Sequence, residues 1–330
     1  LEAYTAADVC NLARVFTGYD FDQSQNGDTV VDGARKVPNT AFTRLPMSLK
    51  ESDHSTLAAT FLGTTIPAGT AGAPSLKIAL DTLHNHPNVG PFLGRQMIQR
   101  LVTSNPSTGY VARVASAFNN NGAGVRGDLR AMFRAILLDE EARSAATLSQ
   151  PLFGKLREPM LRLVQWGRTF GLTSTAGSWK IGDLSNPASQ LGQSPLRSPS
   201  VFNFFRPGYA PPSSALASAQ SVAPEFQLVS ESSVGGYLNY MQNTIQKGIS
   251  SDLKAAYASE LALVTDAAAL VGRLNLLLCA GQLSGATQTL IIDALNATPV
   301  TTTSTDAVKL NRVSAAVLLV MASAEYLAQK

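Results

Sequence analysis

Residues 86–106 read His86-Pro-Asn-Val-Gly-Pro-Phe-Leu-Gly-Arg-Gln-Met-Ile-Gln-Arg-Leu-Val-Thr-Ser-Asn-Pro106. Their apolar side chains recur at the spacing of one helix face: Leu93, Met97, Ile98, Leu101 and Val102. Pro87 and Pro91 suit a first helical turn, because proline lacks the amide hydrogen that has no partner there. The stretch therefore predicts a helix over residues 88–103 with one buried face.

The same spacing predicts further helices along the chain. Thr5 and Asp8 resemble a capping box and predict a helix that runs through Val15 and ends at Gly18. Apolar stripes predict helices over residues 111–118, 129–137, 234–250, 251–278, 284–297 and 306–328. We therefore expect a mainly α protein.

Two long regions lack helical spacing. From Tyr19 to about Ser75, Gly, Pro, Asn, Asp and Thr interrupt every apolar run, which predicts an ordered loop with room for a short hairpin. From Thr173 to about Val222, six prolines surround the aromatic cluster Phe202, Phe204, Phe205 and Tyr209, which we expect to pack. The predicted organisation is one multi-helix domain over residues 1–330: helix plus loop (1–75), helical core (76–172), Pro-rich loop (173–222) and C-terminal helices (223–330).

Composition limits the partners of the chain. Charged residues make up 15% and the net charge is +3, too few and too scattered for a nucleic-acid-binding face. The longest apolar run, residues 315–322, is far shorter than the roughly 18–20 residues that cross a bilayer. Cys10 and Cys279 are the only cysteines, so the chain has either one bridge, worth roughly 2–4 kcal/mol, or two separate thiols. We expect no nucleic-acid partner and no membrane span.

The chain contains only three histidines, His54, His84 and His86, so any histidine-dependent site must use one of them. Asp81, His84 and His86 could supply a carboxylate and two imidazoles to a divalent metal, with His54 from the long loop as a further ligand. Alternatively, His86 caps the next helix from its extended position before Pro87, and His84 is solvated.

A second metal-site candidate lies in the first loop. Asp22, Ser24, Asn26 and Asp28 carry oxygen ligands near the spacing of a calcium loop, with Gly27 at the sixth position. Gly33 stands where the bidentate glutamate belongs, so a polar turn is the alternative.

Charged residues also stand inside apolar blocks. Arg157 and Glu158 lie in Lys155-Leu-Arg-Glu-Pro159, and Arg206 follows two phenylalanines. Because buried charges are normally paired, we expect a structural ion pair that docks the Pro-rich loop onto the helices. The alternative is a site for an anionic ligand, such as an acidic sugar, formed by Arg157 and Arg206.

Further blocks continue in order from residues 86–106: Tyr110-Val-Ala-Arg-Val-Ala115, Phe118-Asn-Asn-Asn-Gly122, Val125-Arg-Gly-Asp-Leu129, Ala135-Ile-Leu-Leu-Asp139, Gly154-Lys-Leu-Arg-Glu-Pro159, Ser198-Pro-Ser-Val-Phe-Asn-Phe-Phe-Arg-Pro207, Ala223-Pro-Glu-Phe226 and Ala322-Ser-Ala-Glu-Tyr326. Together they resemble the bacterial family called domain of unknown function 1800 (DUF1800) over nearly the whole chain. The resemblance implies an exported protein, extracellular or periplasmic, that lacks the family's N-terminal helical region. The family pattern also tends to place histidine at His54 and His86.

These observations lead to three hypotheses about function. No Gly-x-Ser-x-Gly elbow, phosphate loop or His-Glu-x-x-His helix occurs in the sequence, which argues against common hydrolases, nucleotide-binding proteins and zinc proteases. The leading hypothesis is a structural or scaffolding component of a cell-surface or extracellular assembly, built from copies of itself. The alternatives are a secreted metal-assisted enzyme acting on a polymer, and a polysaccharide-binding protein that uses the aromatics of residues 202–209.

Overall fold

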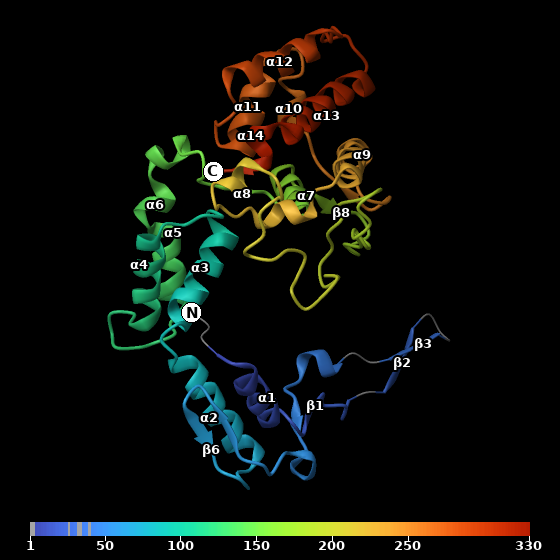
Figure 1. The fold of residues 1–330 in the computed structure, drawn as a ribbon. Coiled ribbons are helices and arrows are strands. Elements are labelled where there is room, and N and C mark those ends of the chain that lie inside the picture. Colours follow the sequence, from blue (N-terminus) through green and yellow to red (C-terminus); the bar gives the residue numbers. More distant parts are fainter. Residues whose placement is uncertain (1–3, 26, 32–34, 39–40) are drawn as a thin grey trace. The chain divides into compact units, whose positions relative to one another are not determined.

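The computed structural model describes residues 4–25, 27–31, 35–38 and 41–330. Helices dominate this part of the chain (Figure 1): it holds fourteen α-helices, whereas its strands are two to four residues long and pair in two-stranded sheets. The prediction of a mainly α fold is confirmed. No helix in these residues has both the length and the apolarity needed to span a membrane.

The chain divides into two compact units. The first comprises Leu1–Gly94 and Val114–Met132, and the second comprises Arg95–Arg113 and Phe133–Lys330. The chain passes from one unit to the other within three helices, α3 (Val89–Leu101), α4 (Thr108–Asn119) and α5 (Leu129–Leu138). All three follow the predicted stripes, since their observed bounds lie within three residues of the expected ones.

In the first unit, α1 (Ala6–Val15) begins at the predicted capping box. The Asp8 amide donates to Thr5 Oγ1 at 3.2 Å, and the Thr5 amide donates to Asp8 Oδ2 at 2.7 Å. Asp8 Oδ1 also accepts from the Leu62 amide at 2.9 Å. One carboxylate therefore caps the helix and fastens a distant turn to it.

Short strands punctuate the first irregular region. β1 (Tyr19–Asp20) pairs with β4 (Ser48–Leu49), β2 (Asp28–Val31) with β3 (Arg35–Pro38), and β5 (Ala59–Phe61) with β6 (Thr64–Ile66). Two short 3-10 turns, η1 (Ala41–Arg44) and η2 (Glu51–Asp53), lie between them. Leu62 and Gly63 join β5 to β6 with φ of 48° and 78°, the positive values that a two-residue hairpin turn requires. The predicted hairpin is therefore present.

One cluster of buried apolar residues in the first unit consists of Val15, Ala59, Phe61, Ile66 and Ala79, the last on α2 (Gly72–Asn85). These residues fasten α1, α2 and the β5–β6 hairpin together. Further residues of this unit are buried as well: Val114, Ala115, Phe118 and Met132.

The second unit holds the larger core. α13 (Asp306–Ala322) packs against α9 (Glu231–Lys247), α11 (Ala267–Cys279) and α12 (Gly285–Asn296), and α11 packs against α7 (Pro159–Thr169). α9, α11, α12 and α13 are coloured orange to red in Figure 1, and α7 is green. Trp166 is fully buried, and its indole donates to Tyr257 Oη at 2.8 Å.

Shorter elements complete the unit: α6 (Glu140–Arg143), η3 (Ala145–Ser149), α8 (Ala215–Ser218), η4 (Pro224–Leu228), α14 (Ala324–Leu327), and β7 (Lys155–Leu156) paired with β10 (Ala328–Gln329).

The single helix expected over residues 251–278 is wrong. The chain forms β9 (Leu253–Lys254) and α10 (Ala258–Leu261), and α11 begins only after Asp266 caps it. β9 pairs with β8 (Thr173–Ser174), far away in the sequence. Long-range pairing overrides the helical preference of this segment.

The second irregular region, residues 173–222, packs against the helices of the second unit, to which it belongs. Leu184 and Leu191 are buried in its core. Its backbone also lies against α9, where a Cβ at Gly236 would stand 2.2 Å from the Pro187 carbonyl oxygen. The region is therefore an ordered loop without helices except α8.

Candidate functional site

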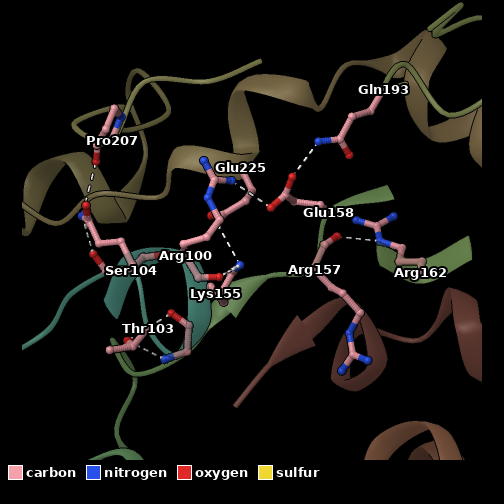
Figure 2. Close-up of polar contacts among 12 residues, drawn as sticks. Arg100, Thr103, Ser104, Lys155, Arg157, Glu158, Arg162, Gln193, Pro207 and Glu225 are labelled. Carbon is pink, nitrogen blue, oxygen red and sulfur yellow. Dashed lines mark hydrogen bonds and ion pairs between the residues drawn. The ribbon is translucent and has the colours of Figure 1, made fainter. Parts of the chain in front are cut away.

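A buried ion pair lies at the start of the block that contains Arg157 and Glu158. Lys155 Nζ is 3.4 Å from Glu225 Oε1, and the two side chains are 1% and 2% exposed. Lys155 Nζ also donates to the Arg100 carbonyl oxygen at 2.8 Å (Figure 2). Burial raises the pKa of the Glu225 carboxyl, although the Lys155 charge opposes that effect.

Glu158 forms a second ion pair near the first, with Glu158 buried and the Arg100 side chain 39% exposed. Its carboxylate accepts from Arg100 Nη1 at 2.9 Å and from Gln193 Nε2 at 2.6 Å (Figure 2). The Arg100 guanidinium lies over the ring of Phe205, 4.6 Å from its centroid. Gln193 and Phe205 belong to the Pro-rich loop, so Glu158 and Arg100 dock that loop onto the helices. The ion pair expected here exists, but the partner of Glu158 is Arg100.

Two arginines stand next to these pairs without a carboxylate. Arg157 Nη1 donates to Gln165 Oε1, and its guanidinium lies 4.6 Å from the centroid of the Tyr326 ring. Arg162 Nε donates to the Arg157 carbonyl oxygen at 2.7 Å, and its guanidinium lies 4.7 Å from the centroid of the Tyr237 ring. Neither arginine forms an ion pair with any carboxylate that the structure describes. Desolvation lowers the pKa of Arg162.

Arg162 lines a cavity of about 400 Å³ in the second unit. The wall is built from β7, α7, η4, α9 and the segment around α14, and almost all of it is apolar: Leu156, Pro159, Phe226, Leu228, Val229, Val234, Leu238, Ala322, Ala324, Leu327 and Ala328. The remaining lining residues are Arg162, Glu225, Ser233 and Tyr237. This cavity is our candidate ligand site.

The predicted metal ligands of the first unit have separate local partners. His54 Nδ1 lies 2.9 Å from the Thr17 carbonyl oxygen, and Asp81 pairs with Lys77 at 2.6 Å. The His84 ring packs near Phe118, with centroids 6.0 Å apart, and His86 Nδ1 accepts from the Asn88 amide at 3.2 Å. Across the described residues, no group of three or more His, Cys, Asp or Glu side chains could hold a metal ion.

The candidate calcium loop is described only in part. Asp22 Oδ1 accepts from the Ser24 amide at 2.9 Å, the contact of a polar turn. This hydrogen bonding lowers the pKa of Asp22. Asn26 and the side chain of Asp28 lie outside the described residues.

The two arginines proposed for an anionic ligand are placed differently. Arg157 is half-buried, whereas Arg206 is exposed and its guanidinium lies 5.5 Å from the centroid of the Phe202 ring. In the aromatic cluster, Phe205 is buried and Phe202 is 64% exposed. The cluster therefore packs only in part. Cys10 and Cys279 are free thiols, the first exposed and the second buried.

Sequence reasoning missed Lys155, Arg162 and Glu225. All three were visible as charged residues in otherwise apolar blocks, the signal that did single out Arg157 and Glu158. Glu225 lies 70 residues further along the chain than Lys155, and no sequence spacing indicated that the two side chains meet. The ion-pair partners of the buried charges therefore could not be assigned from the sequence.

Comparison with known proteins gives a family. A family model described as "Protein of unknown function (DUF1800)" matches residues 1–328. The chain belongs to the DUF1800 family. No match was found among curated proteins or among solved structures. Membership of DUF1800 brings no activity with it, so function has to be argued from this chain's own residues.

Proposed function

We propose that this DUF1800 protein is an exported structural component that assembles with copies of itself through the Pro-rich loop. One observation carries the proposal. Three apolar side chains close together in the sequence point into solvent, with Leu196 104% exposed, Val201 95% and Phe202 64%. We call these three residues the apolar tip. Exposed apolar groups of this kind favour association, because contact with a partner removes them from water.

The apolar tip is held in shape by local contacts. Leu196 has a φ of 59°, a left-handed conformation that costs energy for a leucine. The Arg197 amide donates to the Ser194 carbonyl oxygen at 3.2 Å, and Arg197 pairs with Asp183 at 3.1 Å. An exposed segment that is already ordered loses little conformational entropy when it binds. The tip is therefore suited to a specific contact between copies.

Anchors at the base of the loop support the same proposal. Ser194 and Gln193 are 3% exposed, and Gln193 bonds both Glu158 and the Met160 amide. Leu196, the first residue of the apolar tip, follows the buried Ser194 by two residues. A buried, hydrogen-bonded base next to exposed apolar residues is the arrangement expected of a docking element rather than of a solvated linker.

Export is the second part of the proposal. Its support is the DUF1800 membership together with a low share of charged residues, 15% of the chain. Fractionation of the source bacterium, with antibody detection, should find the protein in the periplasm or outside the cell. Detection in the cytoplasmic fraction alone would contradict export and leave the assembly test unaffected.

Assembly is tested by placing a charge on the tip. Light scattering should give a larger mass for the wild-type protein than for Leu196→Asp or Val201→Asp, because a buried carboxylate opposes association. Leu290→Asp is the matched control: Leu290 is 71% exposed on α12, away from the tip in sequence. If all three variants keep the wild-type mass, the tip is not the contact.

A further inference from the structure

Arg162 is in an unusual position for a charged residue. It is 6% exposed on the buried face of α7, and its observed contacts are the Arg157 carbonyl oxygen and the face of Tyr237. A buried guanidinium is normally paired with a carboxylate, because desolvation of an unpaired charge is costly. Within the described chain, no Asp or Glu pairs with Arg162.

The neighbouring charges leave a positive excess. Lys155 and Arg100 are matched by Glu225 and Glu158, which form their ion pairs. Arg157 and Arg162 carry two further positive charges that no carboxylate of the described chain neutralises. An anion beside Arg162 would therefore be attracted, and it would not have to displace Glu158 or Glu225 from its ion pair.

The cavity that Arg162 lines determines the kind of anion. Its volume of about 400 Å³ falls in the range of small-molecule sites. Its walls are formed mainly by Leu, Val, Ala, Pro and Phe side chains, which favour an alkyl or aryl group. Glu225 also lines the cavity and would repel a dianion more strongly than a monoanion.

We propose that this cavity binds a small apolar monocarboxylic acid, with its carboxylate on the Arg162 guanidinium and its alkyl or aryl group against the apolar wall. A guanidinium offers a carboxylate two parallel N–H donors, so the contact fixes the orientation of the acid. A neutral apolar molecule of the same shape would fill the cavity but leave Arg162 without a counter-charge. The inference concerns the second unit alone and does not depend on the proposed assembly.

Calorimetric titration of the purified protein with octanoate and with octanol tests the proposal. We expect octanoate to bind roughly tenfold more tightly than octanol, because hydrogen bonds to charged groups add that much discrimination. Octanoate should also raise the thermal unfolding midpoint. Equal binding of the acid and the alcohol, or binding of neither, would overturn the assignment.

Two variants separate the site from general effects on folding. Arg162→Met should bind octanoate and octanol alike. If Arg162→Met does not fold, Val234→Trp replaces it: Val234 is 50% exposed and lines the cavity, so the larger ring should block entry without disturbing the core. Leu276→Trp is the control, since Leu276 is 69% exposed and does not line the cavity.

If Val234→Trp binds octanoate as the wild type does, the acid sits elsewhere and the proposal fails. A loss of assembled mass in Val234→Trp, with no octanoate bound by the wild type, would identify a second copy as the occupant and also overturn it.

Discussion

At the scale of single residues, the main finding is how the second unit accommodates buried charge. The three charged side chains of the block Lys155-Leu-Arg-Glu-Pro159 contact different partners. Lys155 pairs with Glu225, Glu158 with Arg100 and Gln193, and Arg157 lies over Tyr326. Charged residues that look alike in the sequence therefore have distinct structural roles.

Lys155→Met should lower the free energy of unfolding by about 3–5 kcal/mol, because it leaves Glu225 buried without its cation. Adding Glu225→Leu should recover much of that loss, since replacing both partners of a buried pair by apolar residues is often nearly neutral. Urea denaturation of the two variants measures both effects. Equal stability of Lys155→Met and the wild type would show that the pair contributes nothing.

The same variant should change the pH dependence of stability. The folded state already raises the Glu225 pKa above its ordinary 4.5, and removal of Lys155 should raise it further. A raised carboxyl pKa means that the folded state binds more protons, so stability falls as pH rises from 4.5 through the folded value. Lys155→Met should therefore lose more stability between acidic and neutral pH than the wild type does.

At the scale of elements, the Pro-rich loop depends on a few long-range anchors. Asp252, next to β9, accepts hydrogen bonds from Ser174 Oγ at 2.6 Å, the Ala176 amide at 2.6 Å and Ser178 Oγ at 2.8 Å. These bonds, that of Ser174 foremost, hold the pKa of Asp252 well below its ordinary 3.8. One carboxylate thus organises the first residues of the loop.

Asp252→Asn should loosen the start of the loop at neutral pH, because an amide cannot accept all of these hydrogen bonds. A depressed carboxyl pKa gives stability that is present above pH 3.8 and is lost as pH falls through the folded value. Limited proteolysis should therefore cut residues 173–180 faster in the variant at neutral pH. The difference should shrink in acid, and a difference that is constant with pH would argue against a role for the charge.

Two adjacent glycines on α9 should respond to alanine with opposite signs. Gly236→Ala would place a Cβ 2.2 Å from the Pro187 carbonyl oxygen, so the loop or the helix must move. A Cβ at Gly235 meets nothing within 4 Å, and Gly235→Ala should stabilise the helix by about 0.5–1 kcal/mol. Denaturation midpoints of the two variants provide the comparison. Stabilisation by both would show that the loop does not press on α9.

Local patterns predicted the helices well and the long-range contacts poorly. α3 follows directly from its apolar stripe, and α1 from the Thr5–Asp8 capping box. The sequence predicts a helix from Ser251, but Leu253 and Lys254 pair instead with the distant Thr173–Ser174 strand, which no local pattern reveals. The buried cluster is similar, because its charged residues can be recognised singly, whereas their pairing depends on the folded path of the chain.

At the scale of the whole molecule, the two units differ in the candidate functional features that they contain. In the first, the histidines and Asp81 have separate local partners. The second carries the larger core, the cavity with Arg162, and the apolar tip. The residues on which the binding and assembly proposals rest therefore lie in the second unit.

Sedimentation velocity of the wild-type protein over a wide range of concentration tests the assembly proposal most directly. The apolar tip predicts a mass that rises above the 34.8 kDa of one chain as concentration increases. Leu196→Asp should shift this rise to higher concentration, and Leu290→Asp should leave it in place. A mass of 34.8 kDa at every concentration would contradict the account.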